Sequence, residues 1–359
     1  MVKNVYIHIP FCKSKCKYCS FISFNELKFK NDFLKALKKE IKHYYKEEKI
    51  NTLYFGGGTP SLLSAEEFNK LIRLFNINKD TEITVELNPE NVNFEYLEKL
   101  QDTGINRLSI GAQTFNDEIL KIISRRHNSL DIEKAVNLAK KAGFNNISLD
   151  FIYGLPLQTI KDFENDLLRA ISLGVQHISL YGLKIEEGCY FFENMPDDLP
   201  DADIQADMYL KAIEILSGLK HYEISNFSLS GYNSKHNLNY WDNNNYYGFG
   251  VAAHGYINNV RYSNIDNLQD YIKNPLVHKQ ENSLSTEEQL EEEIFLGFRK
   301  ISGINIENIN KKFNIDFHEK YSNIINKYSD KYILKTPTGY RLSVDGILIS
   351  NEILSEFIN

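Results

Sequence analysis

Three segments of the chain repeat one short pattern, and this repeat limits the fold more than any other feature. The segments begin at Gly104, Gly143 and Gly174, and each reads glycine, apolar, two variable residues, apolar, serine, apolar. A glycine can end a helix in the left-handed conformation, and the apolar run after it is typical of a strand entering a sheet. The repeats begin about 30 to 40 residues apart, which is the length of one β/α unit.

Strand-like and helix-like segments alternate through the first half of the chain. Apolar residues of one early helical segment share a face, at Phe33, Leu37, Ile41 and Tyr44. The strand-like runs cover residues 5–9, 53–55, 83–87, 107–110, 147–152 and 178–183. Six units are too few for a closed eight-fold barrel, so we expect an α/β fold with a partial (β/α)6 TIM-like barrel. A doubly wound parallel sheet is the alternative.

The pattern changes after about residue 184, and we expect three parts with boundaries at 1–184, 185–283 and 284–359. In the second part we expect a helix over 202–216, a strand over 222–227 and a segment without clear periodicity over 233–255. The third part opens with a capping-box pattern at Ser285 and a helix over 284–299. Two short helices, a hairpin turning around 337–339 and a segment over 347–357 complete a small α+β, winged-helix-like extension.

Charge and hydropathy exclude two classes of protein. The chain has 41 Lys and Arg against 48 Asp and Glu, which gives a net charge of −7. An acidic chain is a poor candidate for binding nucleic acid by broad phosphate neutralisation. No stretch approaches the ~18 consecutive apolar residues of a transmembrane helix, and the strand-like residues 2–9 leave no room for a secretory signal. We therefore expect a cytoplasmic protein without a transmembrane segment.

Three of the four cysteines lie close together, at Cys12, Cys16 and Cys19. Iron–sulfur clusters are usually held by four thiolates, so three from one loop would hold a cubane and leave one iron without a protein ligand. An open metal position suits a reactive site. The alternative is a zinc site completed by His8, although no second Cys or His pair follows downstream. Cys189 stands alone and is expected to be a small buried hydrophobic residue.

Polar residues gather where the predicted strands end, which is where β/α barrels place their working residues. A glycine triplet, Gly56 to Gly58, follows the second strand, and taken alone a turn explains it better than a ligand does. Gln113 follows the fourth strand; taken alone, Glu86 and Asp150 could be ordinary strand-end carboxylates and Arg125 a solvated helix charge. Gathered around one rim of the barrel, these four residues suit a small zwitterionic ligand such as S-adenosylmethionine, because a carboxylate can hold an ammonium group and an arginine can hold a carboxylate. Tyr18 offers a flat apolar face for the adenine.

With these motifs in view, the chain resembles the radical S-adenosylmethionine superfamily and, more narrowly, the oxygen-independent coproporphyrinogen III oxidase family. The matching segments are 6–12, 56–61, 86–89, 109–115 and 150–156. The resemblance implies that the three cysteines bind a 4Fe–4S cluster. It also implies that S-adenosylmethionine chelates the open iron and is cleaved to methionine and a 5′-deoxyadenosyl radical. By the same resemblance, the residues of the S-adenosylmethionine region are Tyr6, Gly57, Gly58, Thr59, Glu86, Gln113, Arg125 and Asp150.

Two departures separate the chain from the oxidases. The oxidase pattern has a further cysteine where this chain has Phe21, and it has a longer N-terminal arm. Both departures resemble the HemW branch, whose members are regarded as heme chaperones and carry an H-N-x-x-Y-W segment associated with heme. Here that segment provides His236, Asn237, Tyr240 and Trp241.

Imidazole is a common axial ligand of heme iron, so His236 is a candidate ligand. Flat apolar surface for the macrocycle could come from aromatic side chains at Tyr240, Trp241, Tyr246, Tyr247 and Phe249. The alternative is that His236 only hydrogen-bonds its neighbours while the aromatic residues pack over the barrel. His254 is a second candidate ligand.

The resemblance implies a heme carrier with a 4Fe–4S cluster and S-adenosylmethionine. Its partners would be heme or a porphyrin, an unidentified heme acceptor protein and a reductant such as flavodoxin or ferredoxin. The rival function is an enzyme, radical decarboxylation of coproporphyrinogen III propionates to vinyl groups. The missing arm and Phe21 disfavour it, since a primary radical needs a closed site. A radical methyltransferase is the third alternative.

Overall fold

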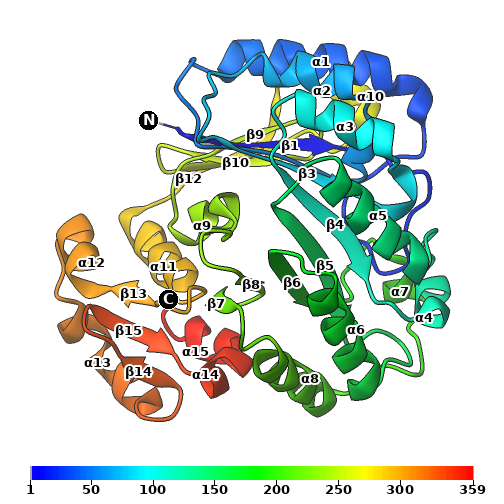
Figure 1. The fold of residues 1–359 in the computed structure, drawn as a ribbon. Helices are drawn as coiled ribbons and strands as arrows, with labels where there is room; N and C mark the ends of the chain where they lie inside the picture. The colour runs from blue at the N-terminus through cyan, green and yellow to red at the C-terminus, as the bar shows by residue number, and fades with distance from the viewer. Residues whose placement is uncertain (1, 359) are drawn as a thin grey trace.

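The computed structural model describes residues 2–358, and its centre is a curved sheet with helices along its outer face (Figure 1). Six parallel strands form the middle of the sheet: β1 (Asn4–Ile9), β2 (Thr52–Gly57), β3 (Glu82–Leu87), β4 (Arg107–Gln113), β5 (Ile147–Tyr153) and β6 (His177–Gly182). The connecting helices are α1 (Lys30–Tyr44), α2 (Ala65–Ile72), α3 (Phe94–Asp102), α4 (Asp117–Ile122), α5 (Ser129–Lys141) and α6 (Ile160–Ser172).

The strand order confirms the barrel and excludes the doubly wound alternative. The strands lie in the order β7-β8-β6-β5-β4-β3-β2-β1-β9, so β1 to β6 follow one another without the reversal that a doubly wound sheet requires. At one edge β9 (Tyr247–Phe249) pairs parallel with β1. At the other edge β8 (Asn226–Ser228) and β7 (Lys220–Glu223) are antiparallel. The barrel is therefore partial and open.

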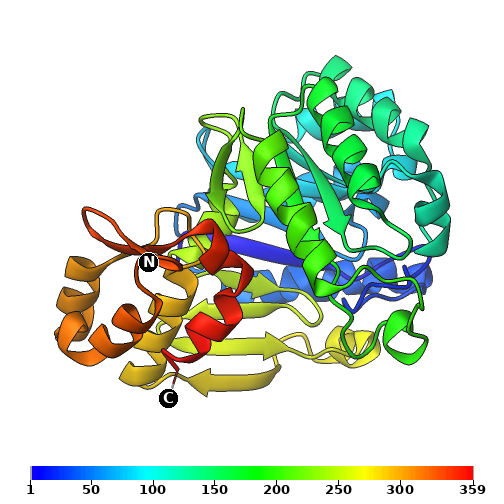
Figure 2. The ribbon, with the colours of Figure 1, turned by 90° about the horizontal axis from the view of Figure 1, so that it is seen from below.

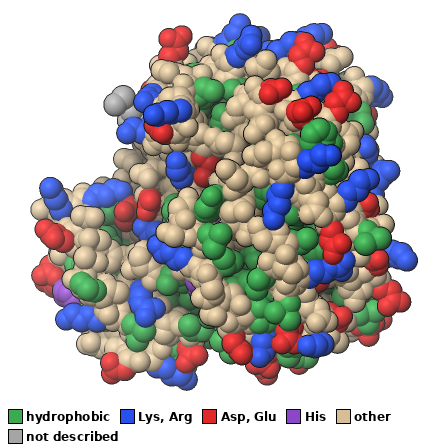
Figure 3. Space-filling view, in the orientation of Figure 1, with side chains coloured by type: hydrophobic (Ala, Val, Ile, Leu, Met, Phe, Trp, Pro, Cys, Tyr) green, Lys and Arg blue, Asp and Glu red, His purple; other side chains and the backbone are tan. Residues whose placement is uncertain are grey.

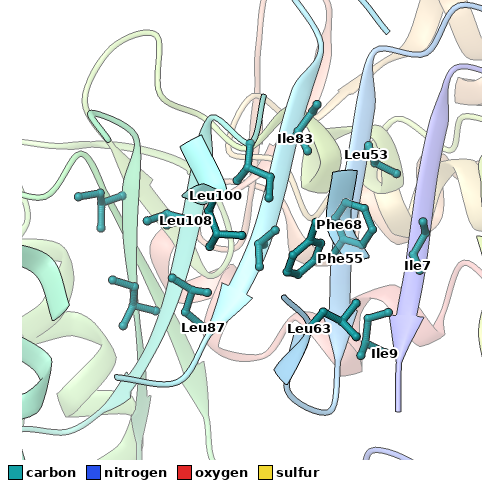
Figure 4. Close-up of a cluster of buried hydrophobic side chains, with 14 of the residues drawn as sticks. Ile7, Ile9, Leu53, Phe55, Leu63, Phe68, Ile83, Leu87, Leu100 and Leu108 are labelled. Atoms are coloured by element: carbon teal, nitrogen blue, oxygen red, sulfur yellow. The ribbon is translucent and has the colours of Figure 1, made fainter. Parts of the chain in front are cut away.

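Along each strand, alternate side chains point to opposite faces of the sheet, which separates the apolar core from the polar site. Leu53 and Phe55 of β2 are fully buried, and Phe55 packs edge-on against Phe68 of α2 with ring centroids 5.0 Å apart (Figure 4). Successive side chains of a strand point to opposite faces, so Tyr54, between Leu53 and Phe55, faces the interior of the barrel. Glu86 and Asp150 likewise sit between buried apolar neighbours. The apolar face stabilises the fold and the polar face lines the site.

The part after residue 184 differs from the sequence prediction in two places. The single strand expected over 222–227 is a tight hairpin, because β7 ends at Glu223 and β8 begins at Asn226. The region expected to lack periodicity contains helix α9 (Lys235–Trp241) and strands β9 and β10 (His254–Ile257). Ser234 caps α9, and β9 is held by pairing with β1. These elements depend on tertiary partners, which local periodicity does not record.

Helix α8 (Ala202–Ile215) confirms the helix predicted over 202–216. Two smaller units follow it in the chain. Strands β10, β11 (Val260–Asn264) and β12 (His278–Ser283) form an antiparallel sheet. Helix α11 (Thr286–Gly297) starts with the predicted capping box of Ser285 and Glu288. The remaining elements are α7 (Tyr190–Glu193), α10 (Leu268–Lys273), β13 (Ile304–Asn305), α12 (Ile306–Phe313), α13 (Phe317–Tyr328), β14 (Ile333–Lys335), β15 (Gly339–Leu342), α14 (Val344–Leu348) and α15 (Ser350–Ser355). Figure 2 shows this C-terminal unit beside the barrel, next to the sheet of β10 to β12.

The surface carries charges of both signs. On the face drawn in Figure 3, Lys and Arg side chains are interspersed with Asp and Glu, without a continuous basic stripe. Such a stripe is the footprint of proteins that bind nucleic acid electrostatically. Within residues 2–358, no helix combines the length and the apolar character that spanning a membrane requires.

Candidate functional site

The cysteine loop opens onto a cavity at the carboxyl ends of the parallel strands. The cavity has a volume of about 450 Å³, within the ordinary range for small-molecule sites. Cys12, Cys16 and Cys19 all line it. The predicted residues that also line it are Tyr18, Gly57, Gly58, Thr59, Glu86, Gln113, Arg125 and Asp150. Eight of the nine residues expected around S-adenosylmethionine thus share one cavity with the three thiols.

The thiols are surrounded by hydrogen-bond donors. Thr59 Oγ1 donates to Cys12 Sγ at 3.4 Å, and Arg125 Nη1 donates to Cys16 Sγ at 3.7 Å. Burial raises the pKa of the Cys19 thiol to about 11, so iron binding there displaces a proton. Donors and a cation beside thiolates stabilise the negative charge that a bound cluster carries. The residues present therefore fit a cluster held by three cysteines.

Arg125 connects the cysteine loop to the barrel. Its Nη2 donates to Asn88 Oδ1 and to the carbonyl oxygen of Gly111, both at 2.8 Å. Its Nε is buried without a hydrogen-bond partner among residues 2–358. A buried guanidinium nitrogen left unpaired beside a cavity suits a ligand carboxylate, because carboxylates accept strong hydrogen bonds from arginine.

Two carboxylates lie deeper in the cavity. Glu86 accepts from Tyr54 at 2.8 Å and from the backbone N–H of Gly57 at 3.2 Å. Burial raises the pKa of Glu86 to about 7, and the negative charge of Asp150 adds to the rise although both hydrogen bonds oppose it. Asp150 accepts from Ser109 at 2.7 Å and from Ser148 at 2.9 Å. The pair can bind hydroxyl or ammonium groups.

The glycine triplet is required by the packing of the chain itself. A Cβ on Gly57 would lie 2.7 Å from the His8 ring, and one on Gly58 would lie 2.8 Å from the carbonyl oxygen of Phe11. The N–H groups of both residues donate within the protein, to Glu86 and to the Ile9 carbonyl. Close packing of β2 against the start of the cysteine loop therefore explains the triplet without a ligand.

Some residues of the cavity were not predicted, and one predicted residue lies outside it. Tyr54 and Asn88 line the cavity and hold Glu86 and Arg125. The position of Asn88 directly after β3 was an available signal, whereas Tyr54 lies within β2. Tyr6 does not line this cavity; its ring stacks on that of Tyr54 with centroids 6.1 Å apart, and it lines a neighbouring cavity instead. Gln113 ends β4 in the left-handed region, with φ of 66°.

The structure gives little support to a zinc site. Both ring nitrogens of His8 are engaged, with Tyr6 at 3.2 Å and with the Ile22 carbonyl oxygen at 2.9 Å. Within residues 2–358, no three Cys, His, Asp or Glu side chains gather closely enough for one ion. A cubane does not need such a group, since each thiolate binds a different iron.

Cys189 is buried in a small apolar cluster with Ile119 and Leu120, as expected.

The H-N-x-x-Y-W segment forms helix α9, and His236 is one of its most buried residues. The His236 side chain is enclosed, with the residue 1% exposed, and its ring nitrogens contact Thr52 Oγ1 at 2.8 Å and Tyr240 OH at 2.9 Å. Burial lowers the pKa of His236 to about 3. Asn237 and Trp241 lie on a different face of the helix from His236 and Tyr240. In this arrangement His236 has no ring nitrogen available for iron, which fits the structural alternative.

A second cavity of about 450 Å³ lies between β1, α9 and the sheet of β10 to β12. His254 lines it, as do Tyr240 and Tyr246, whereas His236, Asn237 and Trp241 do not. Tyr247 and Phe249, the other predicted macrocycle contacts, are buried in β9. Ser20 and Phe21 line both this cavity and that of the thiols.

Comparison with known proteins supports the family that the sequence motifs predict. The chain matches the Radical SAM superfamily over residues 6–170 and the HemN C-terminal domain over residues 284–348. It is 37% identical to the heme chaperone HemW of Lactococcus lactis, with 99% of this chain and 97% of that protein covered. It is 35% identical to the heme chaperone HemW of Bacillus subtilis, with 99% of each covered.

Among solved structures, the coproporphyrinogen III oxidase HemN of Escherichia coli superposes with a TM-score of 0.86. The two share 22% identity, with 99% of this chain and 90% of that chain covered, so this match concerns the fold. The similarity to the chaperones extends along nearly the whole chain. The chain therefore belongs to the HemW family within the radical S-adenosylmethionine superfamily.

Proposed function

We propose that the protein is a cytoplasmic heme chaperone, which binds heme and passes it to an acceptor protein. The full-length similarity to proteins named heme chaperone HemW carries the proposal. Phe21 stands where the oxidase pattern has a cysteine, and it is 67% exposed. A radical enzyme has to exclude water from its reacting centre, so exposed apolar surface beside the thiols favours a carrier over the oxidase.

The first cavity would hold a 4Fe–4S cluster and S-adenosylmethionine. Cys12, Cys16 and Cys19 would bind the cluster, which when bound supplies an electron-transfer centre with one iron open to S-adenosylmethionine. Arg125 would hold the carboxylate of that ligand through its unpaired Nε. Glu86 and Asp150 would bind its hydroxyl or ammonium groups, and Tyr18 would cover the adenine. Thr59 would hold Cys12 in place through its hydrogen bond.

The remaining predicted residues take supporting roles. Gly57 and Gly58 allow β2 to approach the cysteine loop, Gln113 lines the cavity, and Tyr6 supports Tyr54 by stacking on its ring. A reductant such as flavodoxin or ferredoxin would supply electrons to the cluster. Asn237 and Trp241 belong to α9, whose His236 contacts Thr52 and Glu82 at the amino ends of β2 and β3, and neither lines the second cavity, so their contribution to heme binding would be indirect.

The test compares a carrier with an enzyme in one preparation. The chain is reconstituted anaerobically with iron and sulfide and divided between heme and coproporphyrinogen III, the latter with S-adenosylmethionine and reductant. We expect stoichiometric heme binding and no protoporphyrinogen. Formation of protoporphyrinogen with 5′-deoxyadenosine would make the protein an oxidase, and methylation of an added acceptor would make it a methyltransferase.

A further inference from the structure

We propose that heme occupies the second cavity and that His254 is its iron ligand. This inference rests on the proposed heme-carrier function and specifies the site for it. The cavity is lined by His254, by aromatic rings and by Lys279, and it shares a wall with the cavity of the thiols.

His254 differs from His236 in its access to a ligand. His254 begins β10 and is exposed, and within the described chain no group forms a hydrogen bond with its ring. Burial of part of the ring and the nearby positive charges of Arg261 and Lys279 lower the pKa of His254. Neutral imidazole is the form that binds iron. His236, in contrast, has both nitrogens engaged inside the barrel.

The walls of the cavity suit a flat macrocycle with acidic substituents. Tyr240 and Tyr246 pack edge to face with ring centroids 4.7 Å apart, and the exposed ring of Phe21 lies on another side. Such rings offer flat apolar surface to a porphyrin. Lys279 is more than half exposed while it pairs with Asp266, so it can also reach a propionate at the mouth of the cavity.

The two cavities share a wall formed by Ser20 and Phe21, so heme in the second cavity would lie beside the cluster. Ser20 and Phe21 directly follow Cys19 and line both cavities. The wall is fixed at two points, where Ser20 donates to Glu186 at 3.1 Å and where the Ile22 carbonyl meets His8 at 2.9 Å. A porphyrin in the second cavity would therefore contact the segment that carries the third cysteine.

The experiment titrates the cluster-loaded chain with ferric heme and measures two quantities. The dissociation constant comes from quenching of Trp241, the single tryptophan of the chain. The iron ligand comes from electron paramagnetic resonance of the ferric heme, because an oxidised 4Fe–4S cluster is diamagnetic. In His254→Ala we expect affinity to fall about 10–100-fold. We also expect loss of the imidazole-ligated signal and its recovery when free imidazole is added.

Three further variants make the result specific. Phe21→Ala should weaken heme binding while it retains the cluster iron. His318→Ala, which removes an exposed histidine of α13, should match the wild type in both quantities. His236→Ala should lower stability but keep the imidazole-ligated signal. The inference is wrong if His254→Ala binds heme with wild-type affinity and signal, whereas a wild-type chain that binds no heme refutes the proposed function itself.

Discussion

Individual side chains at the strand ends decide what the first cavity can bind. Arg125 is the clearest case, since one guanidinium contacts three elements. It bonds to Cys16 of the cysteine loop, to Asn88 just before the short helix η3 (Pro89–Asn91), and to Gly111 of β4. A planar group with fixed donors can make these contacts and still present Nε to a ligand. Lysine carries the same charge on a flexible stem with a single nitrogen.

Arg125→Lys should therefore weaken S-adenosylmethionine binding by about tenfold or more, because the charge remains but the fork is lost. Equilibrium binding to the cluster-loaded chain measures this. Arg126→Lys is the matched control, since Arg126 is the exposed neighbour and should bind as the wild type does. Wild-type affinity in Arg125→Lys would show that charge alone accounts for the role of Arg125, and equal weakening in both variants would show that the effect is not specific to Arg125.

The sequence predicted those site residues that belong to a dense motif or that are charged within an otherwise apolar strand. Cys12, Cys16, Cys19, Glu86 and Asp150 are of this kind, and the parallel sheet brings them to one edge. Tyr54 was missed because it lies within a strand, where an aromatic residue is ordinary. The enclosure of His236 could not be predicted either, because it depends on Thr52, a distant residue of β2.

At the scale of elements, one buried carboxylate joins the barrel to the extension. Glu40 of α1 accepts from the N–H of Gly250 at 2.9 Å, from Asn264 Nδ2 at 2.6 Å and from the hydroxyl of Tyr271. These partners come from the end of β9, from β11 and from α10, elements far from α1 in sequence. The pattern of apolar residues that predicted α1 contains no signal for this connection.

Glu40→Ala should destabilise the chain by about 3 kcal/mol or more, because it leaves several buried donors without an acceptor. Urea denaturation followed by circular dichroism gives the free energy of unfolding. Glu26→Ala, on an exposed residue before α1, should change it by less than about 0.5 kcal/mol. A similarly small change in Glu40→Ala would contradict the connecting role.

Glu40→Gln tests the charge of the same group through pH. Burial raises the pKa of Glu40 to about 7 against the three hydrogen bonds that lower it. The native state therefore keeps a proton that the unfolded chain releases above about pH 4.5, and native stability contributed by this group falls as pH rises from 5 to 8. The variant cannot ionise, so its stability relative to the wild type should increase by about 2–3 kcal/mol over that range. A constant difference between the two proteins would contradict the raised pKa.

At the scale of the whole molecule, the C-terminal unit has its own apolar core. Phe298, Phe317, Tyr321 and Phe357 belong to this second cluster, to which α8 contributes Tyr209. The cluster of the barrel is separate and extends from Val2 to Tyr271. We keep the division at residues 184 and 283 as a proposal, and the separate cores support the second boundary.

Phe298→Ala should destabilise the C-terminal unit by about 3–5 kcal/mol, because it removes a ring that is 2% exposed. Limited proteolysis should then cut the chain after about residue 284 while the barrel retains its iron. Phe295→Ala, three residues earlier in α11, where the ring is only partly buried, should resist cleavage better. Loss of iron together with cleavage would show that the two units unfold as one.

The account depends most on the three thiols, and spectroscopy of the cluster tests them directly. After anaerobic reconstitution, the wild type and Cys189→Ala should hold about four irons and four sulfides per chain, whereas Cys16→Ala should lose them. The paramagnetic resonance of the reduced cluster should change when S-adenosylmethionine is added, because that ligand binds the open iron. A chain that takes up zinc instead of the cluster, or a resonance that S-adenosylmethionine leaves unchanged, would contradict the account.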